Sequence, residues 1–522
     1  MKTIRSIICH LSLYHFLYIF ISLSLGMSIA FTHPATAAGP QYGGRITLAG
    51  ETEGLGFDAI KTRSLMGSAR AMSRLVMERL FDKGENGELL PVLGLSADQS
   101  EDGKKWTITL RQGVKFHDGT PFNADAVVSH WNRLLNPKNR FRGLLLIRPV
   151  ESVEKTGEFE VTFRLKHPWA PFTSFITNPT GFSSLIPSPT AVENDIQNLS
   201  PVGTGPFIFK EWKRGSHMRV VKNLEYWQQG KPYLDEIVYK PILDHGARYA
   251  ALASGQADIM ITDRPAHVKK LGNNPEFSKH LMVFRGAGIF VLNTRKPPLD
   301  DVRVRRALAL AWDQEKYLAM SFKNIMPFTQ HWFGDAIGCE DVGYPSNDIQ
   351  KASQLISAYG KPVELEYVHT ATNRGKEAGI IVQQLMKQIN VKINPVPSDF
   401  PGIVKRLVSK QYDMSSWLIP GNADMGPITT AILHSKSPWN MSGYNDPQMD
   451  KLLMELKMAV DPKQREALMC RIARKANTDV PFIFIFGRTY HLFYKNHIKN
   501  LNLPKHGEDG LKLQNAWLDQ SL

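Results

Sequence analysis

Two stretches of the chain alternate apolar and polar side chains with a period of two. In residues 106–111, Trp, Ile and Leu alternate with Thr, Thr and Arg, and residues 159–165 place Phe, Val, Phe and Leu at every other position. This period is typical of a strand with one buried face. Residues 482–486 are apolar throughout, as in a strand buried on both faces. The pattern therefore predicts strands in all three segments.

Other segments repeat their apolar residues at helical spacing. Asp446-Pro447 and Asp461-Pro462 each combine an N-cap with a proline at the first helical position, and leucines follow the first of them in a stripe. Residues 376–389 carry a similar stripe, and Asn123 is a candidate N-cap for a helix that ends near Leu135. Strands and helices mix without strict alternation, which favours α/β or α+β lobes.

The first residues have the features of an export signal. Lys2 and Arg5 precede a long apolar run over residues 7–31, and residues 35–37 read Ala-Thr-Ala, a small-x-small cleavage pattern. We expect export to the periplasm with cleavage near Ala37. Because the apolar run is long for a signal peptide, an uncleaved anchor is the alternative.

Length and composition limit the class of protein. The chain has 522 residues, of which 43% are hydrophobic and 21% charged, and this excludes a disordered chain and a polytopic membrane protein. The part that follows the signal is too long for one core, so at least two lobes are expected. Net charge is +14, but the basic residues are scattered among acids and no nucleic-acid motif accompanies them, so no nucleic-acid partner is expected.

No catalytic or metal motif stands out. The three cysteines, Cys9, Cys339 and Cys470, lack metal or redox spacing; Cys339 and Cys470 either pair in an oxidising compartment or remain free thiols. Ser152 and Lys155 match a serine–lysine pattern that needs a second lysine element. Phosphate-binding loops, zinc motifs and nucleophile elbows are absent from the sequence. We therefore expect no enzyme, no cofactor and no metal.

Four sets of residues occur in a fixed order along the chain. They are DQSEDGKKWTITLRQGVKFHDGTP at 98–121, VGTGPF at 202–207 with Asn, Tyr and Trp at 223, 226 and 227, LxxGxxDI at 252–259, and PxDDVRVRRA at 298–307. This ordered set resembles the signature blocks of family 5 solute-binding proteins of ABC importers, the periplasmic receptors for peptides and nickel complexes.

The resemblance implies a two-lobed α/β fold of the large class II, cluster C type, with a hinge between the lobes. By analogy, lobe I comprises residues 38–285 with a C-terminal return over 488–522, and lobe II comprises residues 286–487. Such a protein, expected to be monomeric, closes on a peptide or other small solute and delivers it to a membrane permease. An exported enzyme or a chemosensory ligand receptor on the same fold is the alternative.

The resemblance also suggests ligand-binding residues. Trp417 corresponds to a pocket tryptophan and precedes a loop in which Asn422 and Asp424 are candidate polar contacts; a core position is the alternative for Trp417. Arg140 and Arg142 lie where nickel-complex binders place a ligand-contacting arginine, and either clamp a carboxylate or form a solvated patch.

Two further positions bear on the class of ligand. Dipeptide binders hold the peptide carboxylate with an arginine where this chain has His369, and the amine with an aspartate where it has Pro420. A neutral histidine and a proline leave both charges unpaired. We therefore expect a longer peptide or a non-peptide solute, with His369 as a hydrogen-bonding contact. Ser183 stands where nickel binders have a second arginine, which argues against nickel.

Overall fold

The computed structural model describes residues 39–521, except 63–67, 85–87, 178–183, 335–336, 340, 423, 504–505 and 508–510. Residues 42–522 form one compact unit. The expected export signal, its cleavage site near Ala37, and Ser183 lie outside the described residues. No helix in the described part of the chain is both long and apolar enough to cross a membrane.

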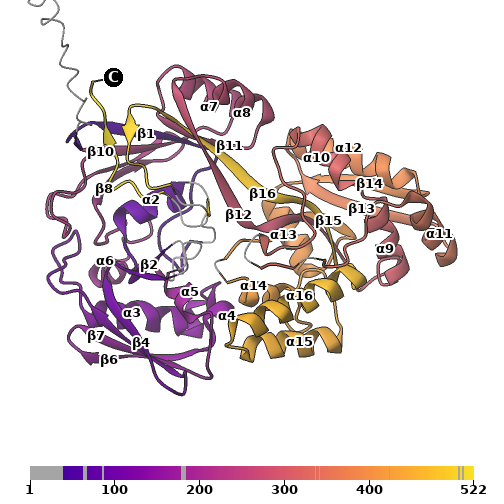
Figure 1. Cartoon of the computed structure of the whole chain (residues 1–522), viewed down its shortest axis with the longest axis horizontal. Helices are drawn as coiled ribbons and strands as arrows, with labels where there is room; N and C mark the ends of the chain where they lie inside the picture. The colour runs from indigo at the N-terminus through magenta and orange to yellow at the C-terminus, as the bar shows by residue number, and fades with distance from the viewer. Residues whose placement is uncertain are drawn as a thin grey trace, which may run out of the picture. The chain divides into compact units, whose positions relative to one another are not determined.

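A ten-stranded mixed sheet runs through this unit (Figure 1). Its two longest strands, β12 and β16, pair antiparallel at its centre and continue from the magenta part of the molecule into the orange part (Figure 1). In spatial order the strands are β14 (Val391–Ser398), β13 (Val363–Thr370), β15 (Met414–Leu418), β12 (Phe277–Leu292), β16 (Phe482–Lys495), β11 (Ile259–Thr262), β1 (Arg45–Gly50), β10 (Glu236–Pro241), β9 (His217–Lys222) and β8 (Phe207–Lys213).

A separate four-stranded sheet, formed by residues 94–165, packs against the helix α3 (Ala124–Leu135). Its antiparallel strands, in spatial order, are β4 (Gly94–Gln99), β5 (Lys105–Leu110), β7 (Glu160–Leu165) and β6 (Val150–Gly157). Trp131 on α3 meets Phe163 of β7 edge to face in the core beneath this sheet. The strands predicted near 106–111 and 159–165 are β5 and β7, which confirms the period-two interpretation.

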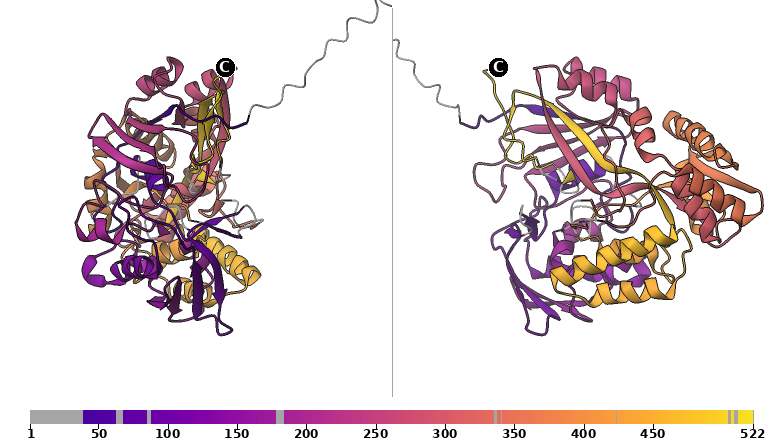
Figure 2. Two further views of the ribbon diagram at one scale, coloured as in Figure 1. Left: turned by 90° about the vertical axis from the view of Figure 1, so that its left-hand side faces the viewer. Right: turned by 45° about the vertical axis from the view of Figure 1, so that its right-hand side comes forward.

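The remaining elements are mostly helices that cover the sheets, seen from two further directions in Figure 2. In the N-terminal part they are α2 (Ser68–Val76), α4 (Leu144–Ile147), α5 (Phe172–Ile176), α6 (Pro189–Glu193), α7 (His245–Ala253) and α8 (Pro265–Gly272). Further along they are α9 (Val302–Ala311), α10 (Gln314–Phe322), α11 (Ile349–Tyr359), α12 (Asn373–Lys387), α13 (Phe400–Ser409), α14 (Gly426–Leu433), α15 (Pro447–Met458) and α16 (Pro462–Asp479). The short strands are β2 (Phe81–Lys83), β3 (Leu89–Pro91), β17 (Ile498–Lys499) and β18 (Trp517–Leu518).

The predicted helix starts are confirmed by their caps. The side chain of Asp446 accepts a hydrogen bond from the backbone N–H of Met449 at 2.7 Å, and that of Asp461 accepts one from Gln464 at 2.8 Å. Asn123 likewise caps α3. Each cap satisfies a backbone donor that the first helical turn leaves without a partner.

The buried side chains separate into cores on either side of one irregularity in β12. Two large cores draw their fully buried side chains from residues 287–485, and the others draw theirs from residues before 283 and after 491. The pairing of β12 with β16 is irregular between Phe284 and Ala287, where Gly286 has φ +88°. A Cβ at Gly286 would lie 2.1 Å from the carbonyl oxygen of Ile419, so both the conformation and the space require glycine. The fold is therefore two-lobed, and the lobes are joined through β12 and β16.

The residues of the second signature block build a buried polar centre in lobe I. Glu78 accepts hydrogen bonds from Thr204 Oγ1 at 2.9 Å, Tyr226 Oη at 2.7 Å and Trp227 Nε1 at 2.8 Å. The three hydrogen bonds lower the pKa of Glu78, but burial has the larger effect and raises the pKa to about 7. A Cβ on Gly203 would lie 2.3 Å from the carbonyl oxygen of Val76, so this turn packs directly on backbone. The block is architectural.

Cys339 and Cys470 form a disulfide in this structure. It ties the segment that precedes α11 to α16, across a sequence separation of 131 residues. Sequence reasoning left the pairing open because nothing in the spacing brings the two positions together.

Candidate ligand-binding site

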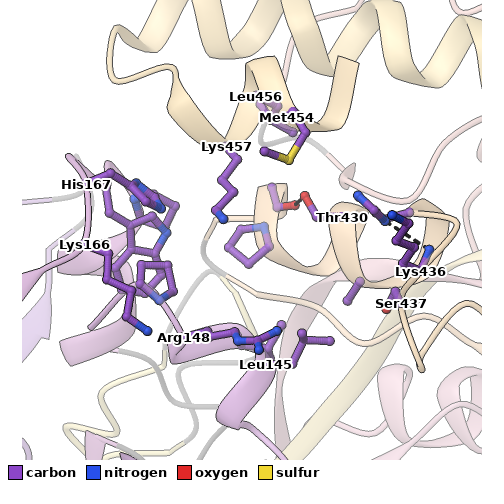
Figure 3. A pocket seen from close by; sticks show the side chains of 18 of the residues that line it. Leu145, Arg148, Lys166, His167, Thr430, Lys436, Ser437, Met454, Leu456 and Lys457 are labelled. Carbon is purple, nitrogen blue, oxygen red and sulfur yellow. Dashed lines mark hydrogen bonds between the residues drawn. The ribbon is translucent and has the colours of Figure 1, made fainter. Parts of the chain in front are cut away.

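A cavity of about 420 Å³ lies where the two lobes meet. One wall comes from lobe I, around α4 and the segments that follow β7, and the other comes from α14, α15 and the start of α16 in lobe II (Figure 3). Leu146 of α4 packs against buried cores of both lobes, and α4 contacts α14. The volume lies in the range of small-molecule sites, which lie preferentially between domains.

Part of the cavity wall is apolar. Leu145, Trp169 and Pro171 contribute from lobe I, and Met454 and Leu456 contribute from α15. Leu145 lies on the four-residue helix α4, and Leu456 lies near the end of the twelve-residue helix α15. This part of the wall suits a hydrocarbon surface of a ligand.

The charged part of the wall is entirely basic. Arg148 and Lys166 belong to lobe I, and Lys436 and Lys457 belong to lobe II. Figure 3 shows Lys457 extending toward the cavity from one side and Arg148 lying on the opposite side. No Asp or Glu is among the described residues that line the cavity, and none of the four cations forms an ion pair with a described residue.

One lining cation, Arg465, is already neutralised. Its Nη2 donates to both carboxylate oxygens of Asp424, at 2.9 and 2.8 Å, and its Nη1 donates to the carbonyl oxygens of Leu456 and Ala459. Asp424 also accepts from the backbone N–H of Gly426. The bonds of Asp424, a predicted ligand contact, are thus made within lobe II in this conformation, and its role toward a ligand stays a prediction.

Trp417 and Asn422 are not among the residues that line the cavity. Trp417, on β15, is half-buried and stacks on Phe400 with a centroid distance of 6.0 Å and an interplanar angle of 5°. Asn422 is buried, and its Oδ1 has no hydrogen-bond partner among the residues described. A half-buried aromatic face and a buried oxygen without a partner can both contact a ligand. The roles of Trp417 and Asn422 as ligand contacts stay predictions.

The other predicted positions are placed differently. His369 is only 2% exposed; its Nδ1 lies 2.9 Å from the carbonyl oxygen of Thr370 and its Nε2 faces Gly379 of α12. Arg140 and Arg142 are both exposed, and neither lines the cavity described above. Arg148, from the same basic cluster, does line it.

Sequence reasoning missed most of the basic wall. Lys166, Lys436 and Lys457 come from three segments with no shared motif, and each is an ordinary exposed lysine. Only the arrangement of the lobes brings them around one cavity. No group of metal-ligating side chains is present in the described residues.

The model of the bacterial extracellular solute-binding proteins, family 5 (middle region), matches residues 88–440. The chain belongs to this family. Its members are substrate-binding proteins of ABC importers, and the two-lobed fold and the signature blocks described above agree with that membership.

Proteins similar to this chain include several that are named for the peptides they bind. The chain is 29% identical to di/tripeptide-binding protein 2 of Pseudomonas aeruginosa over 441 residues, which cover 76% of this chain and 80% of the relative. It is 24% identical to the oligopeptide-binding protein AppA of Bacillus subtilis over 552 residues, 99% of this chain and 100% of the relative. The structure of DppA from Helicobacter pylori, in complex with the peptide STSA, matches with a TM-score of 0.81 at 21% identity, over 92% of this chain and 99% of that one.

Proposed function

We propose that this protein captures a peptide or other small solute between its lobes and delivers it to the permease of an ABC importer. The observation that carries the proposal is the cavity of about 420 Å³, whose walls come from both lobes. A ligand that contacts both walls gains all its contacts only when the lobes are together, so binding favours the closed arrangement.

The lobe boundaries follow the same argument. We place lobe I at residues 38–285 with the return over 488–522, and lobe II at 286–487. The irregularity of β12 at Gly286 supports this division, because the register of its pairing with β16 shifts there and such bulges bend a strand. The protein acts as a monomer in the periplasm after cleavage near Ala37, without catalysing a reaction.

The proposed ligand is not an ordinary dipeptide. Some relatives are named for di- and tripeptides, yet this chain has the buried His369 and the exposed Pro420 at the positions discussed above. Neither side chain supplies a full opposite charge to a zwitterion in a closed site. A longer peptide or a non-peptide solute avoids this cost.

Mass spectrometry of solute released from freshly purified, denatured protein tests the proposal. We expect one solute in near-stoichiometric amount, and uptake of that solute by cells should require both this protein and a permease. Titration with a dipeptide library, followed by the melting temperature, tests the ligand class, because tight ligands stabilise by mass action. Micromolar binding of ordinary dipeptides contradicts the proposed class, and turnover of the recovered solute contradicts a binding role.

A further inference from the structure

The interlobe cavity is lined by basic side chains from both lobes and by no described acid. Arg148 and Lys166 approach from lobe I, and Lys436 and Lys457 from lobe II (Figure 3). Like charges brought together across a closing interface repel each other, and the repulsion grows as water leaves. An anion bound between the lobes offsets this repulsion.

The neighbouring acids do not supply such an anion. Asp424 is engaged by Arg465, and Asp450 accepts hydrogen bonds from the backbone N–H and the side chain of Ser435. Asp450 also lies 3.8 Å from His434, a further lining residue. Among the described residues, neither of these two acids forms an ion pair with any of the four cations.

The apolar wall adds a second requirement. The open apolar surface comes chiefly from the half-buried Leu145 on the lobe I side and from Met454, 46% exposed, on the lobe II side. Trp169 and Leu456 also line the cavity, although both are nearly fully buried. A bare inorganic anion would leave this surface in contact with water. A solute that covers it must have a hydrocarbon body as well as its charged groups.

We propose that this cavity is a binding subsite for a solute that carries at least two acid groups on an apolar body, with cations of both lobes contacting it. This inference rests on the proposed function, because it names the class of solute that the receptor captures. The acid groups form charge-assisted hydrogen bonds with Arg148 and Lys166 on one side and with Lys436 and Lys457 on the other. Binding removes the repulsion between the lobes and so couples closure to the charge of the solute.

Calorimetric titration with matched probes tests the subsite. The probes are the tripeptide Leu-Glu-Glu and its amide counterpart Leu-Gln-Gln, and heptanedioic acid and its diamide. The protein variants are R148Q/K166Q on the lobe I wall, K436Q/K457Q on the lobe II wall, and K451Q/K463Q as a control. Lys451 and Lys463 are exposed on the same helical region without lining the cavity, so the control removes the same charge elsewhere.

We expect at least one acid probe to bind the wild-type protein tenfold or more tightly than its amide, with an affinity that falls as salt is added. Each cavity double variant should lose this preference, and K451Q/K463Q should keep it. All variants should retain the melting temperature, because the replaced side chains are exposed. A preference for the peptide acid or for heptanedioic acid then distinguishes an acidic peptide from a non-peptide acid.

The inference is overturned if neither acid binds more tightly than its amide, or if the cavity variants bind the acids as the wild type does. Recovery of a neutral solute that wild type and cavity variants bind equally also overturns it, while the proposed receptor function stands. Conversely, a protein that releases no solute and supports no uptake contradicts the receptor function, whatever the cavity titrations show.

Discussion

Arg374 of lobe II and Asp263 of lobe I form an ion pair in which Nη1 lies 2.5 Å from Oδ2. Arg374 lies in the first turn of α12, and Asp263 follows β11. The guanidinium also lies over the ring of Phe322, 4.9 Å from its centroid. Burial alone raises the pKa of Asp263, but the hydrogen bond and charge of Arg374 outweigh it, so the pKa lies below its usual value.

This pair should favour the closed state. We expect D263N to shift the protein toward the open arrangement and to weaken binding of the recovered solute about tenfold, or ~1.4 kcal/mol. Small-angle scattering of the solute-free variant should show a larger radius of gyration than wild type. D300N is a suitable control, because Asp300 is exposed in lobe II and no ion pair of its side chain is described. Unchanged affinity and radius in D263N would show that the pair has no part in closure.

The lowered pKa of Asp263 determines how the stabilisation from the Arg374–Asp263 ion pair depends on pH. The carboxylate is charged in both the folded and unfolded chain above pH ~4, so the stabilisation is fully present there. It is lost only as pH falls through the lowered folded pKa. Solute affinity should therefore not change on account of this pair between pH 5 and 8.

Glu78 should have the opposite effect on the pH dependence of stability. Its pKa rises from 4.5 to about 7 on burial, so the folded state holds a proton that the unfolded chain has lost. The free energy of unfolding should thus fall by about 3 kcal/mol as pH rises from 4.5 to 7. E78Q keeps the shape and cannot ionise, and the hydroxyls of Thr204 and Tyr226 can turn to suit it.

Thermal denaturation of wild type and E78Q at pH 5 and pH 8 measures this difference. We expect the melting temperature of E78Q, measured relative to that of the wild type, to be higher at pH 8 than at pH 5. A difference between the two proteins that stays constant over this range would mean that Glu78 is ionised throughout.

Replacing Trp417 separates its two possible roles. W417A should weaken binding of the recovered solute at least tenfold and lower the melting temperature only slightly, because the side chain is half-buried. F400A is the matched control: it removes the stacked partner, which is 54% exposed, and should leave affinity nearly unchanged. A large loss of stability in W417A with unchanged affinity would instead identify a core tryptophan.

The disulfide between Cys339 and Cys470 should stabilise lobe II. Closing a loop across 131 residues restricts the unfolded chain, and such bonds contribute about 2–5 kcal/mol. We expect a reducing agent to lower the melting temperature of the wild type and to leave that of C339S/C470A unaffected. Equal melting temperatures for oxidised wild type and the double variant would contradict this expectation.

Local signals in the sequence predicted much of the fold. The helices that begin after Asp446 and Asp461, and the strands β5 and β7, depend on caps and on apolar periods within a few residues of each other. The ordered signature blocks indicated the family, because glycines such as Gly203 have no room for a side chain and tolerate few alternatives. Such information is contained in short stretches of the chain.

The cavity and its charges depend on contacts between distant segments. Lys166 and Lys457 line one cavity only because β12 and β16 bring lobe II against lobe I, and Cys470 meets Cys339 only because α16 packs beside the earlier loop. Asp424 looked available in the sequence, but Arg465 reaches it from 41 residues away. The sequence by itself determined the local elements and the family, through short-range caps, periods and steric limits. Tertiary structure alone decided which side chains line the cavity, because charge pairing and burial depend on neighbours that the chain brings together only when it folds.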